Sequence, residues 1–319
     1  MANSENKVLS LDFGGTKLAA AVIDVQTGRI LAEVRRDAPS KQGAAAFIEV
    51  MFEMGAQALQ QCTLAIPARV GISFGGPVNL DRKAVLMSNH VADWEGIPLP
   101  RLATQAFGCP AFMDNDANVA ALGSWTYDVN CGPDNMVYLQ VSTGIGSGII
   151  LDRKLYRGGG LAGEVGHITV IPGGPECVCG KRGCLESLCA GWAIARAGRE
   201  ALQKTTENSP LYQLSRGDPN LVDAHLVIDA ARAGDPLAIE VTSQAFTALG
   251  IAIANVISLF DPQMIILGGG VTRAEAEMRA VLEPVITKEL HPLFADRYQL
   301  SFSKLNGKET LLGAALLQE

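Results

Sequence analysis

Long hydrophobic runs, basic blocks and charged residues are all scarce in this chain of 319 residues. The longest strongly apolar segment, residues 249–260, contains Asn255 and Ser258 and is too short to span a bilayer, so we expect no membrane partner. The 26 Lys and Arg residues are outnumbered by 33 Asp and Glu and form no block, so nucleic acid is not an expected partner. Residues 1–6 are polar and precede no signal-peptide core, so we expect a cytoplasmic protein.

Disulfides are also not expected, because seven cysteines are an odd number and the expected compartment is reducing. Three of the seven, Cys177, Cys179 and Cys184, lie within eight residues. The others are scattered and are interpreted as ordinary core or surface thiols: Cys62, Cys109, Cys131 and Cys189.

Apolar spacing predicts an α/β chain, with two domains or one large unit at this length. The N-terminal part reads as a meander of three strands rather than a βαβ unit. The predicted strands are 8–12, 18–24, 30–36, 69–72, 111–113, 135–141, 149–151 and 264–267, and the predicted helices are 43–61, 99–107, 236–260 and 310–317.

The cysteine-rich segment carries the pattern of a metal site. His167 lies ten residues before Cys177, and three thiols with one imidazole are ligands for a tetrahedral Zn²⁺. Intervening glycines permit the tight backbone that such a cluster needs. The alternative, a core histidine with an ordinary partner, is less favoured because the thiols follow. Glu164 and Glu186 flank the cluster, which would therefore hold two acids in fixed places.

Glycine turns join two pairs of predicted strands. In the first, backbone N–H groups of Gly14 and Gly15 can approach phosphate oxygens, and Thr16 and Lys17 add a hydroxyl and a cation. Asp12, just before this turn, could hold Mg²⁺ through water. The alternative is a plain hairpin turn with incidental charge.

The second turn, residues 142–148, contains Thr143 and Gly144 and repeats the strand–turn–strand pattern, which suggests a duplicated domain. It fits neither the Walker nor the Rossmann spacing, and a flexible β-turn is the alternative. A third glycine turn, with Gly268 and Gly269, follows a predicted strand and could accept a base or ribose, or could simply enter a helix.

Polar residues crowd the end of the strand at 111–113. Asp116 is interpreted as a general base and Asn115 as a hydroxyl binder, in the segment Asp-Asn-Asp-Ala-Asn. The alternative is that Asp116 only caps the following helix.

These motifs together resemble the ROK family of sugar kinases over the whole chain, and within it the glucokinase branch. The first glycine turn is similar to the family's first phosphate loop, and residues 142–146 to the second. The most specific likeness is Glu164-x-x-His167 followed by Cys177-x-Cys179-x4-Cys184-x-Glu186. The chain departs from the family pattern at Gly75 and around Asn89, where further sugar contacts are expected.

The resemblance implies an α/β fold of the actin and hexokinase type, with two domains and a cleft between them. We expect a small domain over residues 1–118, a larger one with the zinc loop over 119–305, and a final helix, about 306–319, that packs back on the small domain. A homodimer or homotetramer is implied as well.

The resemblance also implies site residues. Asp116 would be the catalytic base, and ATP and Mg²⁺ the cofactors beside a structural Zn²⁺. Sugar would bind to Gly76, Asn89, Asn115, Asp116, Glu164, His167 and Glu186. ATP would bind to Asp12, Gly14, Gly15, Thr16, Lys17, Thr143, Gly144, Gly268 and Gly269, and zinc to His167, Cys177, Cys179 and Cys184.

The implied activity is ATP-dependent phosphorylation of a hexose at its 6-hydroxyl, with glucose first. Alternatives are a kinase for N-acetylmannosamine, N-acetylglucosamine, fructose or another hexose, a sugar sensor without turnover, and a zinc-stabilised assembly module. Family repressors carry an N-terminal helix-turn-helix, for which the first strand leaves no room, so a DNA-binding role is not expected.

Overall fold

Five strands form the first sheet of the structure, a computed structural model that describes residues 4–39, 42–79, 81, 83–87 and 91–318. Its order is β3-β2-β1-β4-β7. The first three strands pair antiparallel, which confirms the predicted meander, whereas β4 and β7 run parallel to β1. The strands are β1 (Lys7–Phe13), β2 (Lys17–Asp24), β3 (Arg29–Asp37), β4 (Val70–Phe74) and β7 (Ala111–Asn115).

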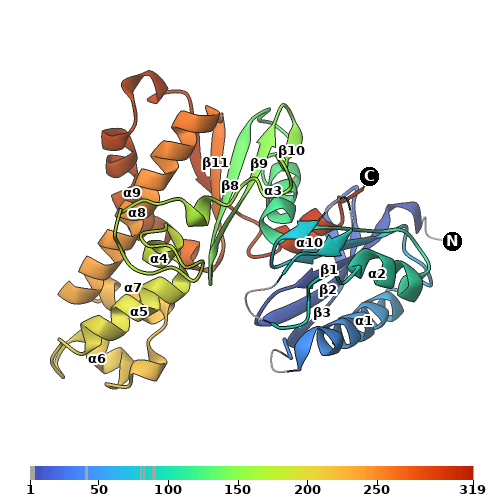
Figure 1. Cartoon of the computed structure of the whole chain (residues 1–319), viewed down its shortest axis with the longest axis horizontal. Coiled ribbons are helices and arrows are strands. Elements are labelled where there is room, and N and C mark those ends of the chain that lie inside the picture. Colours follow the sequence, from blue (N-terminus) through green and yellow to red (C-terminus); the bar gives the residue numbers. More distant parts are fainter. Residues whose placement is uncertain (1–3, 40–41, 80, 82, 88–90, 319) are drawn as a thin grey trace. The chain divides into compact units, whose positions relative to one another are not determined.

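Alternate side chains of this sheet enter two separate cores, because neighbouring residues of a strand face opposite sides. Leu9 and Leu11 pack with Phe47 of α1 (Gly43–Gln61), in a core to which α2 (Leu99–Phe107) also contributes. Val8 packs instead with Leu311 of α10 (Glu309–Ala314). Figure 1 shows α1 and α10 on opposite sides of the strands. Even-numbered residues at the end of β1, including Asp12, therefore face α10.

Helix α10 also packs closely on α3 (Asp116–Tyr127). A Cβ atom added at Gly313 would lie 1.8 Å from the Val119 carbonyl oxygen, and one added at Gly123 would lie 2.3 Å from the Glu309 carbonyl oxygen. Such distances are far inside van der Waals contact. The backbones of the two helices can therefore approach this closely only because both positions are glycine.

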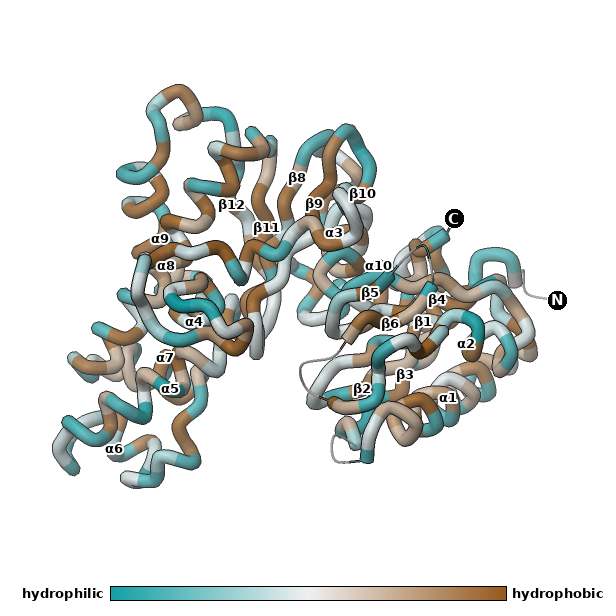
Figure 2. Tube along the Cα trace, viewed as in Figure 1, coloured by the Kyte–Doolittle hydropathy of each residue, from teal (hydrophilic) through white to brown (hydrophobic). Residues whose placement is uncertain are grey.

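The second sheet has the order β10-β9-β8-β11-β12. Strands β8, β11 and β12 run parallel to one another, and β10 pairs antiparallel with β9. Figure 2 shows hydrophobic residues along β8 and β9, in agreement with their burial. The strands are β8 (Met136–Val141), β9 (Ile145–Leu151), β10 (Lys154–Tyr156), β11 (Met264–Gly268) and β12 (Gln299–Phe302).

The long helix α8 (Pro236–Phe260) packs with α4, α5, α7 and α9. By length and composition this helix could cross a bilayer, since one window of 18 residues has a mean hydropathy of 1.6. The apolar stretch is therefore longer than the expected residues 249–260. However, 56% of that window is buried in the structure, as in the core helix of a globular protein. The other α-helices between residues 186 and 289 are α4 (Glu186–Cys189), α5 (Gly191–Leu202), α6 (Pro210–Ser215), α7 (Ala224–Arg232) and α9 (Glu275–Glu289).

The chain divides into two compact units. Unit 1 comprises Met1–Asp134, Gly148–Gly163 and Lys304–Glu319, and unit 2 comprises Asn135–Ser147 and Glu164–Ser303. The first boundary lies beyond the expected residue 118, because α3 packs on α10 and β7 of unit 1. Residues 148–163 also join unit 1, whereas the expected bounds placed them in the larger domain.

Candidate functional site

Three polar residues lie side by side where β1, β4 and β7 end. Asp12 pairs in register with Ser73, and Ser73 with Asp114. The three strands are parallel, so their carboxyl ends share one edge of the sheet, where ligand sites of α/β proteins collect. Thr310 of α10 donates to Asp12 Oδ2 at 2.8 Å. Burial raises the pKa of the Asp12 carboxyl, and the hydrogen bond from Thr310 opposes this only in part.

The first glycine turn leaves β1 directly after Asp12. A Cβ atom at Gly14 would lie 2.7 Å from the Lys17 carbonyl oxygen, so the turn requires glycine there. Thr16 and Lys17 are exposed at its tip. Bare backbone, a hydroxyl and an ammonium group are therefore available to an anionic ligand at this turn.

Hydrogen bonds from backbone N–H groups fix the polar side chains at the end of β7. Asn115, not Asp116, is the N-cap of α3, since its Oδ1 accepts from the N–H groups of Ala117 at 3.0 Å and Asn118 at 3.4 Å. Asp116 is therefore not the N-cap, although its Oδ1 also accepts from the Ala117 N–H at 2.9 Å. Asn115 Nδ2 donates to the Gly76 carbonyl at 3.1 Å, so this amide already has protein partners on both ends.

Asp116 lies next to the first glycine turn. The Cβ position of Gly75 is 3.8 Å from Asp116 Oδ2 and 3.9 Å from Gly14 Cα. The carboxylate and the turn therefore both lie beside Gly75. A Cβ atom at Gly76 would lie 2.8 Å from the Met87 carbonyl oxygen, which explains glycine there. The remaining predicted sugar contact of this region, Asn89, lies outside the described residues.

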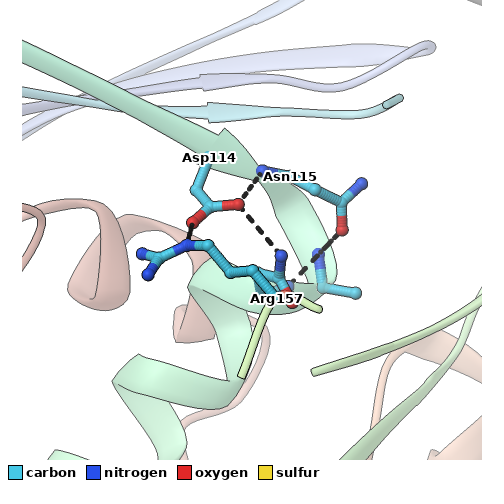
Figure 3. Close-up of polar contacts among 5 residues, drawn as sticks. Asp114, Asn115 and Arg157 are labelled. Carbon is cyan, nitrogen blue, oxygen red and sulfur yellow. Dashed lines mark hydrogen bonds and ion pairs between the residues drawn. The ribbon is translucent and has the colours of Figure 1, made fainter. Parts of the chain in front are cut away.

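The sequence interpretation missed the ion pair beneath this segment. Arg157, just after β10, donates from Nε to Asp114 Oδ2 at 2.6 Å, as Figure 3 shows. Asp114 Oδ1 accepts from the Asn115 N–H at 2.8 Å and from Asn118 Nδ2 at 3.0 Å. Asp114 was inside the motif, but its partner is 43 residues away and no local pattern connects them.

In unit 2, the second glycine turn meets a predicted sugar ligand. Glu186, at the start of α4, is buried and its Oε2 accepts from the Ile145 N–H at 3.0 Å. The same oxygen lies 2.8 Å from the Cβ position of Gly144. Thr143 at the tip of the turn is exposed. Glu186 thus joins the turn to the cysteine-rich segment.

The third glycine turn, after β11, is also constrained. A Cβ atom at Gly268 would lie 2.0 Å from the Tyr138 hydroxyl, and Gly269 has a φ of 98°, which favours glycine. Thr272 donates to the Gly269 carbonyl at 2.7 Å. The turn therefore presents backbone without side chains at the carboxyl end of a parallel strand.

The ligand atoms of four predicted metal-binding residues converge within 4.8 Å of one another: His167, Cys177, Cys179 and Cys184. His167 Nδ1 lies 3.6 Å from Cys177 Sγ, and Cys179 Sγ lies 3.7 Å from Cys184 Sγ. Ligands about 2.3 Å from one tetrahedral centre are roughly 3.8 Å apart, so the donor set fits tetrahedral coordination. Burial raises the pKa of the Cys177 thiol to about 12, so a bound cation would have to displace its proton.

The imidazole of His167 has two different neighbours. While Nδ1 faces the thiols, Nε2 lies 4.0 Å from Glu164 Oε2. Lys181 donates to the His167 carbonyl at 2.7 Å and so fixes the backbone of the same residue. One ring nitrogen is thus placed for a metal, and the other lies beside a half-exposed carboxylate.

Known proteins resemble this chain over most of its length. The glucokinase of Thermotoga maritima is 33% identical over 310 residues, which cover 97% of this chain and 96% of the relative. The crystal structure of a ROK family glucokinase from Streptomyces griseus, in complex with glucose and AMPPNP, is 33% identical with a TM-score of 0.85, covering 97% of this chain and 98% of the other. The xylose repressor of Bacillus spizizenii is 30% identical over 76% of this chain and 59% of the repressor.

The matched structures carry the ROK sugar kinase fold, which is the actin and hexokinase type predicted from the motifs. The family model described as ROK family matches residues 8–319. The chain therefore belongs to the ROK family.

Proposed function

We propose that this chain, an ATP-dependent sugar kinase, transfers the γ-phosphoryl group of ATP to the 6-hydroxyl of glucose. The observation that carries the proposal is the position of Asp116, whose carboxylate lies, like Gly14 of the first glycine turn, within 4 Å of the Cβ position of Gly75. A base beside a turn suited to phosphate is the arrangement that phosphoryl transfer to an alcohol requires. The similarity to glucokinases supports glucose as the acceptor.

In this proposal Asp116 orients the 6-hydroxyl and accepts its proton while the phosphoryl group is transferred in line. The transition state is stabilised chiefly by positioning and by donors to the phosphoryl oxygens. Backbone N–H groups near Gly14 and Gly144 would be such donors, and Asp12 would hold Mg²⁺, which neutralises phosphate charge when bound.

The sugar hydroxyls would bind to Asn115, Glu164, His167 and Glu186, with Gly76 and Asn89 as further contacts. Because both ends of the Asn115 amide have protein partners, the second N–H of Nδ2 is its remaining donor. Lys17, Thr16 and Gly15 would serve the phosphates, and Thr143, Gly268 and Gly269 the rest of the nucleotide.

The four converging ligands would hold a structural Zn²⁺. Such a site has no open coordination position, so the ion would fix the loop that carries Glu164 and His167 rather than take part in the chemistry. We also propose a cytoplasmic location and a homodimer or homotetramer.

The test is an ADP-release assay with ATP across glucose, fructose, N-acetylglucosamine and N-acetylmannosamine. We expect kcat/KM to be highest for glucose. A higher value for another sugar would reassign the substrate, and a xylose repressor among the relatives makes a sugar sensor the second candidate. Glucose binding without ADP release under any condition would favour that sensor.

Asp116→Asn should lower kcat by about 100- to 10,000-fold while glucose binding, measured by calorimetry, stays near the wild-type value, because the amide keeps the shape but cannot accept the proton. Asp296→Asn, an exposed carboxylate in unit 2, is the matched control and should leave kcat unchanged. Near-normal turnover by the Asp116 variant would refute the assignment of the base.

A further inference from the structure

We propose that Arg157 is a positioning residue for phosphoryl transfer, which acts through Asp114 on the segment that carries Asp116. The inference rests on the proposed function, since Asp116 is the base only there. Arg157 lies outside the motifs that define the predicted site, and it reaches the segment from the turn that follows β10.

The Asp114 carboxylate holds the segment at two points. Its Oδ1 accepts from the Asn115 N–H, just before Asp116, and from Asn118 Nδ2, two residues after it. Its Oδ2 accepts from Arg157 Nε, and Figure 3 shows the three interactions together. The orientation of this one carboxylate therefore bears on the backbone on both sides of Asp116.

Because Asp114 is buried, its carboxylate depends on the Arg157 guanidinium group to compensate its charge. The Asp114 side chain is 1% exposed and the Arg157 side chain 36%. Ion pairs between exposed groups contribute little, but removal of one partner from a buried pair leaves a charge without compensation. Without Arg157, we expect the carboxylate to move toward water, and this movement would release Asn115 and Asn118.

Arg157 is itself held by its own loop. Its carbonyl oxygen accepts from the N–H groups of Gly160 at 2.8 Å and Ala162 at 3.2 Å, which closes a tight turn. The side chain thus extends from a defined backbone rather than a loose one. The alternative, in which the exposed part of the guanidinium group touches the transferred phosphoryl group directly, makes a different prediction.

The experiment compares Arg157→Met, Arg157→Lys, Asp114→Asn and the double variant Arg157→Met with Asp114→Asn. Arg153→Met is the matched control, because Arg153 lies just before β10 and also pairs with an acid, Asp134, but both partners are more than half exposed. Each protein is assayed for kcat and KM with glucose and ATP. Amide hydrogen exchange at residues 115–118 is measured without substrates.

We expect Arg157→Met to lower kcat by about 100-fold, since a misplacement of roughly 1 Å has that effect, with little change in KM for ATP. Arg157→Lys should recover part of the loss, and exchange at residues 115–118 should rise in Arg157→Met but not in Arg153→Met. The double variant should be no worse than the more impaired single variant, because both act through one contact.

The proposal is overturned if Arg157→Met keeps kcat within about twofold of wild type with unchanged exchange. It is also overturned if loss of Arg157 has the same effect with and without Asp114, which would indicate direct contact with the phosphoryl group. If Arg157→Met does not fold, Arg157→Lys and Asp114→Asn decide the question by the same two readouts. If wild type phosphorylates no sugar, the proposed function fails, but the exchange data still test the positioning role.

Discussion

Asp12 is a residue at which stability and the proposed function oppose each other. Burial raises the pKa of its carboxyl above 3.8, with partial opposition from Thr310. An acid of this kind stabilises the folded state below its unfolded pKa, and that contribution is lost as the pH rises through the raised pKa. The ionised form of this carboxylate is therefore held in an unfavourable place, as expected for a residue kept for ligand binding.

The variant Asp12→Asn should consequently be at least as stable as wild type at neutral pH, while it loses ATP turnover. The difference in free energy of unfolding should grow in favour of the variant as the pH rises above 3.8. Urea unfolding at several pH values, without nucleotide or Mg²⁺, measures it. Lower stability of the variant at pH 7 would show that the carboxylate is well solvated or paired.

Residue types and spacing suggest which residues form the candidate site, but they carry no information on the contacts among these residues. The convergence of His167 with the thiols could be predicted because the four residues are close in sequence and few other roles fit them. The capping alternative named Asp116 rather than Asn115, since both residue types are good N-caps and only the backbone distinguishes them. Arg157 could not be found at all, because contact with Asp114 depends on folding.

Among the elements, the contact between α3 and α10 is the most sensitive to a single methyl group. Gly313→Ala would place a Cβ atom 1.8 Å from the Val119 carbonyl oxygen, so the helices would have to separate. We expect the free energy of unfolding to fall by about 1–3 kcal/mol or more. Gly159→Ala is the control, because a Cβ there meets nothing within 4 Å, and it should change stability by less than about 0.5 kcal/mol.

Denaturant unfolding followed by circular dichroism distinguishes the two glycine variants. Equal stability of Gly313→Ala and wild type would mean that α10 can shift on α3 without loss of packing. Such a result would also argue against close packing with α10 as the reason that α3 belongs to unit 1.

Long elements with a clear apolar period were predicted to the residue, whereas short edge strands were missed. Helices α1, α2 and α8 have the predicted bounds, since their apolar spacing is regular over several turns. Strands β10 and β12 are short, lie at the edges of their sheet, and have mostly half-buried or exposed side chains, so they show little alternation. Their pairing is a property of the sheet rather than of their own residues.

At the scale of the whole molecule, zinc removal should affect the two units differently. The four proposed ligands all belong to unit 2, whereas β1–β3 and α1 belong to unit 1. After treatment with a chelator, we expect faster amide exchange in residues 164–190, a lower Tm and weaker glucose binding, with β1–β3 unchanged.

Cys184→Ser should reproduce these effects, and Cys62→Ser, a thiol outside the cluster, should not. Metal content is verified by atomic absorption before each measurement. Unchanged exchange in residues 164–190 of verified zinc-free protein would contradict the structural role of the ion.

The fold type followed from the motifs, but the composition of the units did not. Unit 1 gathers three segments separated by long stretches of chain, and local sequence contains no signal for such an association. The prediction that residues 306–319 pack back on the first domain came from resemblance alone. The contact that makes α10 part of unit 1 depends on glycines 190 residues apart, Gly123 and Gly313.

This arrangement bears on how the protein is made. A ribosome that has synthesised the first 134 residues has delivered most of unit 1 without the segment from Lys304 onward. Until that segment emerges, Val8, Ala21 and Ile23 lack the apolar cover that α10 provides, and Asp12 lacks Thr310. One apolar face of the nascent first sheet therefore stays exposed until translation ends, and such a face promotes aggregation. A chaperone that covers this face during synthesis would raise the yield of folded protein.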